Sequence, residues 1–210
     1  MVLPTNMKDV QKHAAAADVA IVFGSAHSGE GSDRKDLLFH QDAGLLKTED
    51  VIDAVSQVQQ NTVVVAVAPG QILTDWRDKV TAVLCVFLPG EQYGNAVADI
   101  IFGSVLPQGK LPLTFPNIEN EQKMTIEQWP GVPSTQFDGH KRVVYSEGQI
   151  NGYRWYDKNQ VKPAYAFGYG LTYGKGGTYS NLIVKGRKIT FGVEVDGCDT
   201  PQIYIGYVQN

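Results

Sequence analysis

The loop from Ser28 to Lys35 holds the side chains of this sequence that are best suited to catalysis, in the order Ser-Gly-Glu-Gly-Ser-Asp-Arg-Lys. Glu30 stands between two glycines, which allow the backbone to approach a substrate closely, and Asp33 and Arg34 follow in the same loop. Cleavage of a glycosidic bond uses one carboxylic acid to protonate the leaving oxygen and a second carboxylate as nucleophile or base. The loop therefore suits general acid/base chemistry, although a solvated turn in which Arg34 pairs with Asp33 would have the same composition.

The Glu30 loop follows an apolar run at residues 18–24, which has the length of a buried strand and ends at a glycine. Two similar runs follow it, and each ends at a Pro-Gly pair. Apolar strands without alternation, separated by helical or polar segments, are typical of a mostly parallel sheet in an α/β domain. We expect three such strands, near residues 19–23, 62–68 and 81–87. Ligands of these sheets bind at the carboxyl ends of the strands, where the Glu30 loop begins.

Helical patterns flank these strands. Residues 7–17 favour a helix by composition, and Thr48 is a suitable N-cap for a second helix, with apolar residues at helical spacing up to Val58. A third helix is expected over 91–102. We place the connecting segments on the faces of the sheet.

The character of the sequence changes after Gly103. Residues 106–174 are rich in proline, glycine and aromatic side chains and predict an extended wrapping segment. Apolar and polar residues then alternate over 179–184 and 188–195, and again over 202–208, which predicts short antiparallel strands.

Composition excludes several classes of function. With 210 residues the chain is shorter than the roughly 250 that a complete β/α barrel needs. Its 18 basic and 22 acidic side chains make nucleic acid an unlikely partner, and no apolar run is long enough to span a membrane. The histidines show no metal-ligand spacing and no phosphate-binding glycine motif follows a strand, so neither a metal nor another cofactor is expected. We see no signal peptide, which leaves localisation open, and expect Cys85 and Cys198 to be free thiols.

A series of short motifs runs along residues 10–184: 17–23 (ADVAIVF), 29–34 (GEGSDR), 61–65 (NTVVV), 88–99 (LPGEQYGNAVAD), 102–103 (FG), 107–116 (PQGKLPLTFP), 145–148 (YSEG), 152–157 (GYRWYD) and 167–173 (FGYGLTY). In these motifs and in their order, the chain resembles the later part of family 3 glycoside hydrolases of the β-glucosidase type.

The resemblance implies a partial six-stranded α/β sandwich, which lacks its first strands, and then the start of a fibronectin type III-like domain. We accordingly expect a sandwich domain at 1–176 and a short antiparallel β segment at 177–210. In the family the glutamate of the Gly-Glu-Gly loop is the general acid/base, which assigns that role to Glu30. The nucleophilic aspartate belongs to an N-terminal β/α barrel, and nothing in this sequence corresponds to that barrel.

Five further residues are candidates for binding the substrate: His27, Asp33, Arg34, Trp76 and Glu147. His27 lies in the Glu30 loop and could hydrogen-bond a sugar hydroxyl. Trp76 follows the second strand, where it could approach the cleft. Glu147 could line a sugar cleft, but an ion pair with Arg154 explains it equally well. Other aromatic side chains, such as Trp129, could stack on sugar rings or fill a core.

The favoured hypothesis is a β-glucosidase portion that acts on β-linked glucosides by retaining hydrolysis and needs no cofactor. An inverting route with Asp33 or Asp75 as base is a minor possibility, and a carbohydrate-binding or interaction domain without catalysis is the alternative. The missing barrel predicts an exposed apolar surface, and hence a barrel partner or self-association. We also expect Glu30 at the lip of a cleft, partly exposed.

Overall fold

The computed structural model describes residues 6–40, 46–174, 177–195 and 204. They form two units. The first consists of Met1–Gly90 and Leu111–Gly168, and the second of Glu91–Lys110 and Tyr169–Asn210. We describe each unit by itself.

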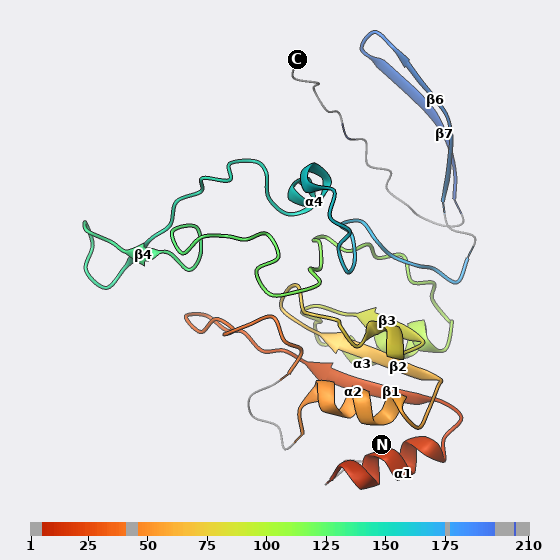
Figure 1. Ribbon diagram of the computed structural model, residues 1–210. Helices are drawn as coiled ribbons and strands as arrows, with labels where there is room; N and C mark the ends of the chain where they lie inside the picture. The colour runs from red at the N-terminus through yellow and green to blue at the C-terminus, as the bar shows by residue number, and fades with distance from the viewer. Residues whose placement is uncertain (1–5, 41–45, 175–176, 196–203, 205–210) are drawn as a thin grey trace. The chain divides into compact units, whose positions relative to one another are not determined.

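A parallel three-stranded sheet lies at the centre of the first unit (Figure 1). Its strands are β1 (Ala20–Ser25), β2 (Thr62–Val67) and β3 (Ala82–Cys85), in the spatial order β1-β2-β3. These strands confirm the mostly parallel α/β sheet that the apolar runs predict. The run predicted at 81–87 is longer than β3. Val86 still donates to the carbonyl of Ala66 at 2.8 Å, and Phe87 then takes a positive φ of 53°, which ends the extended backbone.

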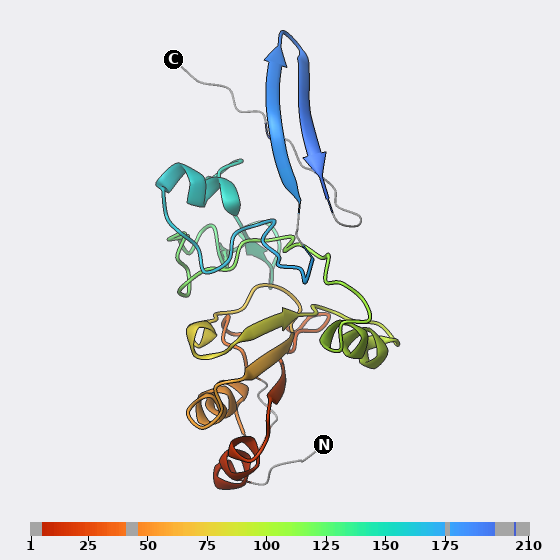
Figure 2. The ribbon, with the colours of Figure 1, turned by 90° about the vertical axis from the view of Figure 1, so that its right-hand side faces the viewer.

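Two helices lie on the same side of this sheet, as Figure 2 shows. Helix α1 (Met7–Ala15) begins at Asn6, whose side chain accepts a hydrogen bond from the backbone N–H of Asp9. Helix α2 (Thr48–Ser56) packs on β1 and β2, and α1 packs on α2. Their buried apolar side chains form one core with Val22 and Val64, which are neighbours across β1 and β2.

On the opposite face of β1, the described residues leave apolar side chains exposed. Ile21 and Phe23 alternate with Val22 and are 40% and 58% exposed, whereas Val65 in the central strand is fully buried. Apolar side chains on an edge strand thus remain accessible to solvent, in line with the expected apolar surface.

The rest of the first unit is a long wrapping segment with little regular structure. It contains the short antiparallel pair β4 (Val132–Pro133) and β5 (Lys141–Arg142) and helix α4 (Tyr153–Asn159). A 3-10 turn, η1 (Arg77–Lys79), connects β2 to β3.

The second unit holds helix α3 (Tyr93–Ile101) and an antiparallel hairpin of β6 (Thr178–Lys185) and β7 (Lys188–Glu194). The hairpin confirms the predicted antiparallel strands at 179–184 and 188–195. The strand predicted at 202–208 and Cys198 lie outside the described residues, and the domain boundaries at 176 and 177 stay a prediction.

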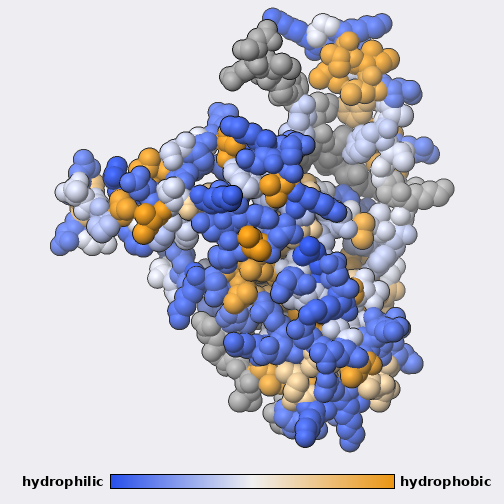
Figure 3. Space-filling view, viewed as in Figure 1, coloured by the Kyte–Doolittle hydropathy of each residue, from blue (hydrophilic) through white to orange (hydrophobic). Residues whose placement is uncertain are grey.

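Apolar side chains gather on this hairpin (Figure 3), where Leu182, Ile183 and Val184 are exposed. Among the described residues, no helix has both the length and the apolar content required to span a bilayer.

Candidate functional site

The Glu30 loop leaves the carboxyl end of β1 at the sheet edge. The backbone N–H of Ala26 donates to the carbonyl of Val67 at 2.9 Å, so pairing with β2 continues just past the strand. Farther out, Gly29 and Ser32 exchange two backbone hydrogen bonds of 3.1 and 3.0 Å. This closes a tight turn, in which Gly31 takes the positive φ of 70° that glycine adopts without strain. Glu30 therefore projects from the tip of the turn.

The side chain of Glu30 is exposed, and in the described part of the chain its carboxylate has no hydrogen bond or ion pair. A carboxylate in this position is free to meet a group that approaches from solvent.

The root of the loop is fixed to two distant segments. Nη2 of Arg34 donates to the carbonyl of Gln71 at 3.0 Å, and the backbone N–H of Leu37 donates to Oε2 of Glu119 at 3.0 Å. Burial lowers the pKa of Arg34, although the charges of Asp36 and Glu119 act in the opposite direction. The Arg34 guanidinium is thus held in place by the backbone of Gln71 through at least one of its nitrogens.

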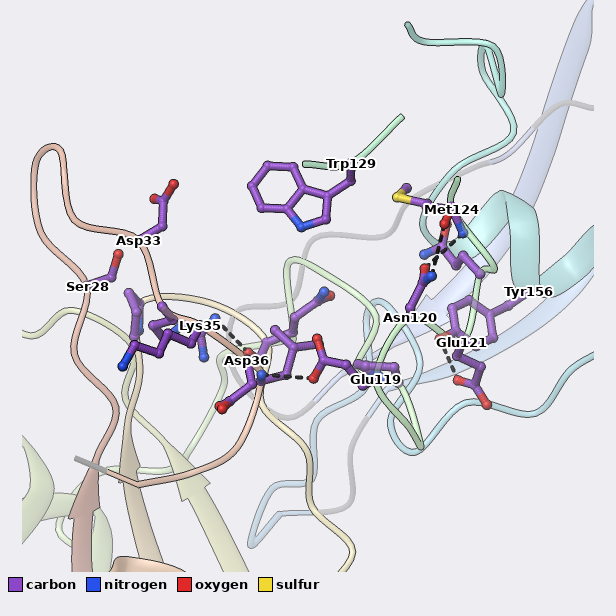
Figure 4. A pocket seen from close by; sticks show the side chains of 16 residues that line it. Ser28, Asp33, Lys35, Asp36, Glu119, Asn120, Glu121, Met124, Trp129 and Tyr156 are labelled. Carbon is purple, nitrogen blue, oxygen red and sulfur yellow. Dashed lines mark hydrogen bonds between the residues drawn. The ribbon is translucent and has the colours of Figure 1, made fainter. Parts of the chain in front are cut away.

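A pocket of about 390 Å³ opens beside this root, wholly within the first unit (Figure 4). The loop, the turn after β2 and the segment after Phe115 contribute most of its wall. The lining residues are Ser28, Asp33, Arg34, Lys35, Asp36, Leu37, Pro69, Gln71, Pro116, Glu119, Asn120, Glu121, Gln122, Met124, Trp129 and Tyr156.

On one side of the pocket lies the carboxylate of Glu121, which accepts several hydrogen bonds. The hydroxyl of Tyr156 donates to Oε2 of Glu121 at 2.7 Å, and the backbone N–H and Nδ2 of Asn117 donate to the same carboxylate at 3.0 Å each. Burial raises the pKa of Glu121, but the hydrogen bonds from Asn117 and Tyr156 outweigh burial and the net shift is downward. Burial, and then the bond to Glu121, raises the pKa of Tyr156 far above its usual range. Glu121 is thus held ionised and Tyr156 protonated.

The structure brings together some of the predicted site residues. Asp33 and Arg34 both line the pocket. His27 is exposed in the same loop, and a Cβ added at Gly29 would lie 3.9 Å from its Nε2, so the imidazole lies beside the glycine that precedes Glu30. Neither His27 nor Glu30 lines the pocket.

Two predicted residues lie elsewhere. Trp76 is only 2% exposed and packs against Phe39 with ring centroids 5.9 Å apart, so it belongs to the core. Its burial does not support the predicted contact with substrate. A large indole after a strand gains more from burial than from exposure at an edge.

Glu147 accepts a hydrogen bond from Nε2 of Gln128 at 2.8 Å, and it is partly buried. The guanidinium of Arg154 lies instead over the ring of Tyr153, 4.7 Å from its centroid. The Glu147–Arg154 ion pair considered above is therefore absent from the described residues.

Glu119 and Glu121, which lie in the wall of the pocket, were not singled out from the sequence. The Leu37–Glu119 bond joins residues that are 82 positions apart, and local patterns carry no information on such a pairing. The acidic residues after Pro116 were the only available hint. In the described part of the chain, no group of three or more His, Cys, Asp or Glu side chains is arranged to hold a metal ion.

The family of the chain follows from comparison with known proteins. Residues 4–173 match the family described as "Glycosyl hydrolase family 3 C-terminal domain". The chain is 35% identical over 187 residues to thermostable beta-glucosidase B of Acetivibrio thermocellus, covering 88% of this chain and 23% of that protein. It is 41% identical over 127 residues to a beta-glucosidase of Rhizobium radiobacter, covering 60% of this chain and 15% of that protein.

Solved structures give the same result. The beta-glucosidase DesR from Streptomyces venezuelae, solved with D-glucose, matches with a TM-score of 0.77 and 32% identity, over 91% of this chain and 24% of that one. Beta-glucosidase 3B from Thermotoga neapolitana matches with a TM-score of 0.75 and 33% identity, over 94% of this chain and 28% of that one. The chain thus spans about a quarter of the length of these structures. By its sequence match and its fold, the chain belongs to the glycosyl hydrolase family 3 C-terminal domain family.

Proposed function

We propose that this chain is the part of a β-glucosidase that carries the general acid/base, and that Glu30 has that role. The observation that carries the proposal is the position of Glu30: an exposed carboxylate without a protein partner in the described residues, at the tip of a turn beyond the carboxyl end of β1. Its family membership and its beta-glucosidase relatives support glycoside hydrolysis as the reaction.

The chemistry requires two carboxyl groups. Glu30 gives its proton to the glycosidic oxygen while an aspartate attacks the anomeric carbon, so the bond to the leaving alcohol breaks and a glycosyl–enzyme ester forms. In the second step Glu30 takes a proton from water, whose oxygen displaces the aspartate and releases the sugar. The anomeric configuration is retained because each step inverts it.

The aspartate comes from outside this chain in this proposal. The relatives that match about nine-tenths of this chain are about four times its length, which leaves ample sequence for a barrel domain that holds the nucleophile. The exposed Ile21 and Phe23 on β1 offer an apolar surface for such a partner or for a second copy. His27, Asp33, Arg34 and Glu147 remain candidates for contacts with a β-glucoside substrate.

A chimera tests the proposal. The matching segment of Acetivibrio thermocellus beta-glucosidase B is replaced by this chain, and hydrolysis of p-nitrophenyl β-glucoside is measured for the wild type and for Glu30→Gln. We expect the variant to lose about 10²- to 10⁴-fold in kcat, which is the usual contribution of a general acid/base. Glu127→Gln is the matched control, because Glu127 is also exposed and lies far along the wrapping segment.

The product reports the stereochemistry. NMR of the first-formed sugar should show the β-anomer, whereas the α-anomer would indicate inversion with Asp33 or Asp75 as base. An active chimera in which Glu30→Gln keeps its kcat would exclude Glu30. A folded but inactive chimera would favour a carbohydrate-binding or interaction domain without catalysis.

A further inference from the structure

The pocket beside the Glu30 loop has a fixed side and a free rim. The fixed side consists of Arg34, Glu119, Glu121 and Tyr156, which are engaged with backbone or with one another. The rim consists of side chains that have no hydrogen bond or ion pair within the described residues: Ser28, Asp33, Lys35, Gln71 and Gln122. A rigid base and unengaged polar groups around an opening are the features of a preformed ligand site.

Trp129 adds an aromatic surface to this pocket. Its side chain is 60% exposed, and in Figure 4 it lies across the cavity from Asp36 and Glu119. An exposed indole is costly in water, and it gains most from a ligand that offers an apolar face. The ring thus faces a cavity whose other walls combine polar side chains with apolar ones such as Leu37, Pro116 and Met124.

The charges of the lining exclude an anionic ligand. Asp33, Asp36, Glu119 and Glu121 outnumber the cations Arg34 and Lys35. The hydroxyl and amide groups of the rim can both donate to and accept from a neutral polyhydroxyl compound, and the carboxylate of the rim can accept. A pyranose has hydroxyls at its edge and C–H groups on its faces, so it matches the rim and the indole together.

We propose that this pocket binds a hexose unit of a neutral oligosaccharide, with Trp129 stacked on the sugar face and Asp33 and Gln122 bonded to its hydroxyls. The volume of about 390 Å³ is within the range of small-molecule sites. This inference rests on the proposed function only in the choice of a glucosyl compound as the probe. It gives the chain a carbohydrate site that needs no residue from outside the first unit.

Titration of the chain with cellobiose tests the site. Intrinsic fluorescence should change with saturation at a dissociation constant on the order of 1 to 10 mM, as expected for a few hydrogen bonds and one stacked ring. Of the three tryptophans, Trp76 is buried, Trp155 is half-buried and Trp129 is exposed, so Trp129 should give the largest blue shift. Loss of the blue shift in Trp129→Ala assigns the signal to Trp129. Mannitol, which has hydroxyls but no ring face, should give no response.

Variants locate the site, with binding measured by calorimetry because Trp129→Ala removes the reporter. Trp129→Ala should abolish binding, and Gln122→Ala and Asp33→Asn should each weaken it about three- to tenfold, the effect of one hydrogen bond. Tyr145→Ala is the matched control, since Tyr145 is 78% exposed and lies outside the pocket. It should bind like the wild type.

Two results would overturn the inference. The first is the absence of saturable heat with cellobiose, and the second is an affinity for cellobiose that is unchanged both in Trp129→Ala and in Gln122→Ala. The outcome is separate from that of the proposed function. Glu30→Gln should bind cellobiose normally. If the chimera is active and depends on Glu30, but the chain does not bind cellobiose, this binding site alone is contradicted. A chain that binds in an inactive chimera contradicts the catalytic role alone.

Discussion

Replacement of Tyr156 by Phe should destabilise the wrapping segment by a predictable amount. The change removes one of three donors to the Glu121 carboxylate, the 2.7 Å bond from the phenol, while Asn117 keeps its two bonds of 3.0 Å. The buried ring and its edge contact with Trp155 remain. A hydrogen bond to a charged group contributes roughly 1.5 to 3 kcal/mol, and the partial exposure of Glu121 favours the lower end. We expect the free energy of unfolding to fall by about 1.5 kcal/mol at pH 7.

The pH dependence of this loss follows from the pKa of Glu121. Because that pKa is lower in the folded chain than its ordinary value of 4.5, folding favours the ionised carboxylate. Its contribution to stability is complete above the ordinary value and is lost as the pH falls through the lowered pKa. The difference between Tyr156→Phe and the wild type should therefore shrink in acid.

Urea denaturation followed by circular dichroism, at pH 7 and at about pH 3, measures both quantities. Tyr145→Phe is the control, because the side chain of Tyr145 is exposed and its hydroxyl donates no hydrogen bond in the described residues. Equal losses at the two pH values, or no loss at pH 7, would refute the assignment of the Tyr156–Glu121 bond as a charged, stabilising contact.

Three further changes have clear expected results. Gly24→Ala should lower the unfolding free energy by about 1 to 3 kcal/mol in urea titrations, because the new Cβ would lie 2.9 Å from the ring of Phe39 and closer still to Thr48; Gly94→Ala, with nothing within 4 Å, should not. Trp76→Ala should cost about 3 to 5 kcal/mol by the same measurement, since Trp76 is buried, while Trp129→Ala should change stability by less than about 0.5 kcal/mol. Burial raises the pKa of Cys85, so mass spectrometry should show it alkylated at pH 7 several-fold more slowly than a free thiol peptide.

The sheet and its helices could be predicted from sequence because their signals are local. Apolar runs of strand length marked β1, β2 and β3, a helix-favouring composition marked α1, and apolar residues at helical spacing marked α2. The expected N-cap at Thr48 was wrong by one position, because Thr48 is the first residue of α2 and Lys47 precedes it as the N-cap. The first and last residues of the strands were harder to predict, because a strand ends where its neighbour no longer pairs with it. The loop at Glu30 could be predicted as well, because its two glycines and its polar composition are properties of the segment itself.

The pocket could not be predicted in the same way. Glu119 meets Leu37 across 82 positions of the sequence, and Tyr156 reaches Glu121 across 35. Trp76 is a different case: its position after a strand suggested the cleft, whereas the structure shows its large apolar side chain buried in the core. Side-chain direction and long-range partners decide such cases, and both require coordinates.

The most direct test of the role of Glu30 is azide rescue of Glu30→Ala in the chimera. Azide is an anion and a nucleophile that needs no base, so it should fit the space of the missing carboxylate and attack the glycosyl–enzyme ester. We predict that turnover of an activated aryl β-glucoside, which needs no proton for its leaving group, rises many-fold with azide and yields β-glucosyl azide. A Glu30→Ala chimera that azide does not accelerate, or that releases only glucose in its presence, would contradict the assignment of Glu30 as the general acid/base.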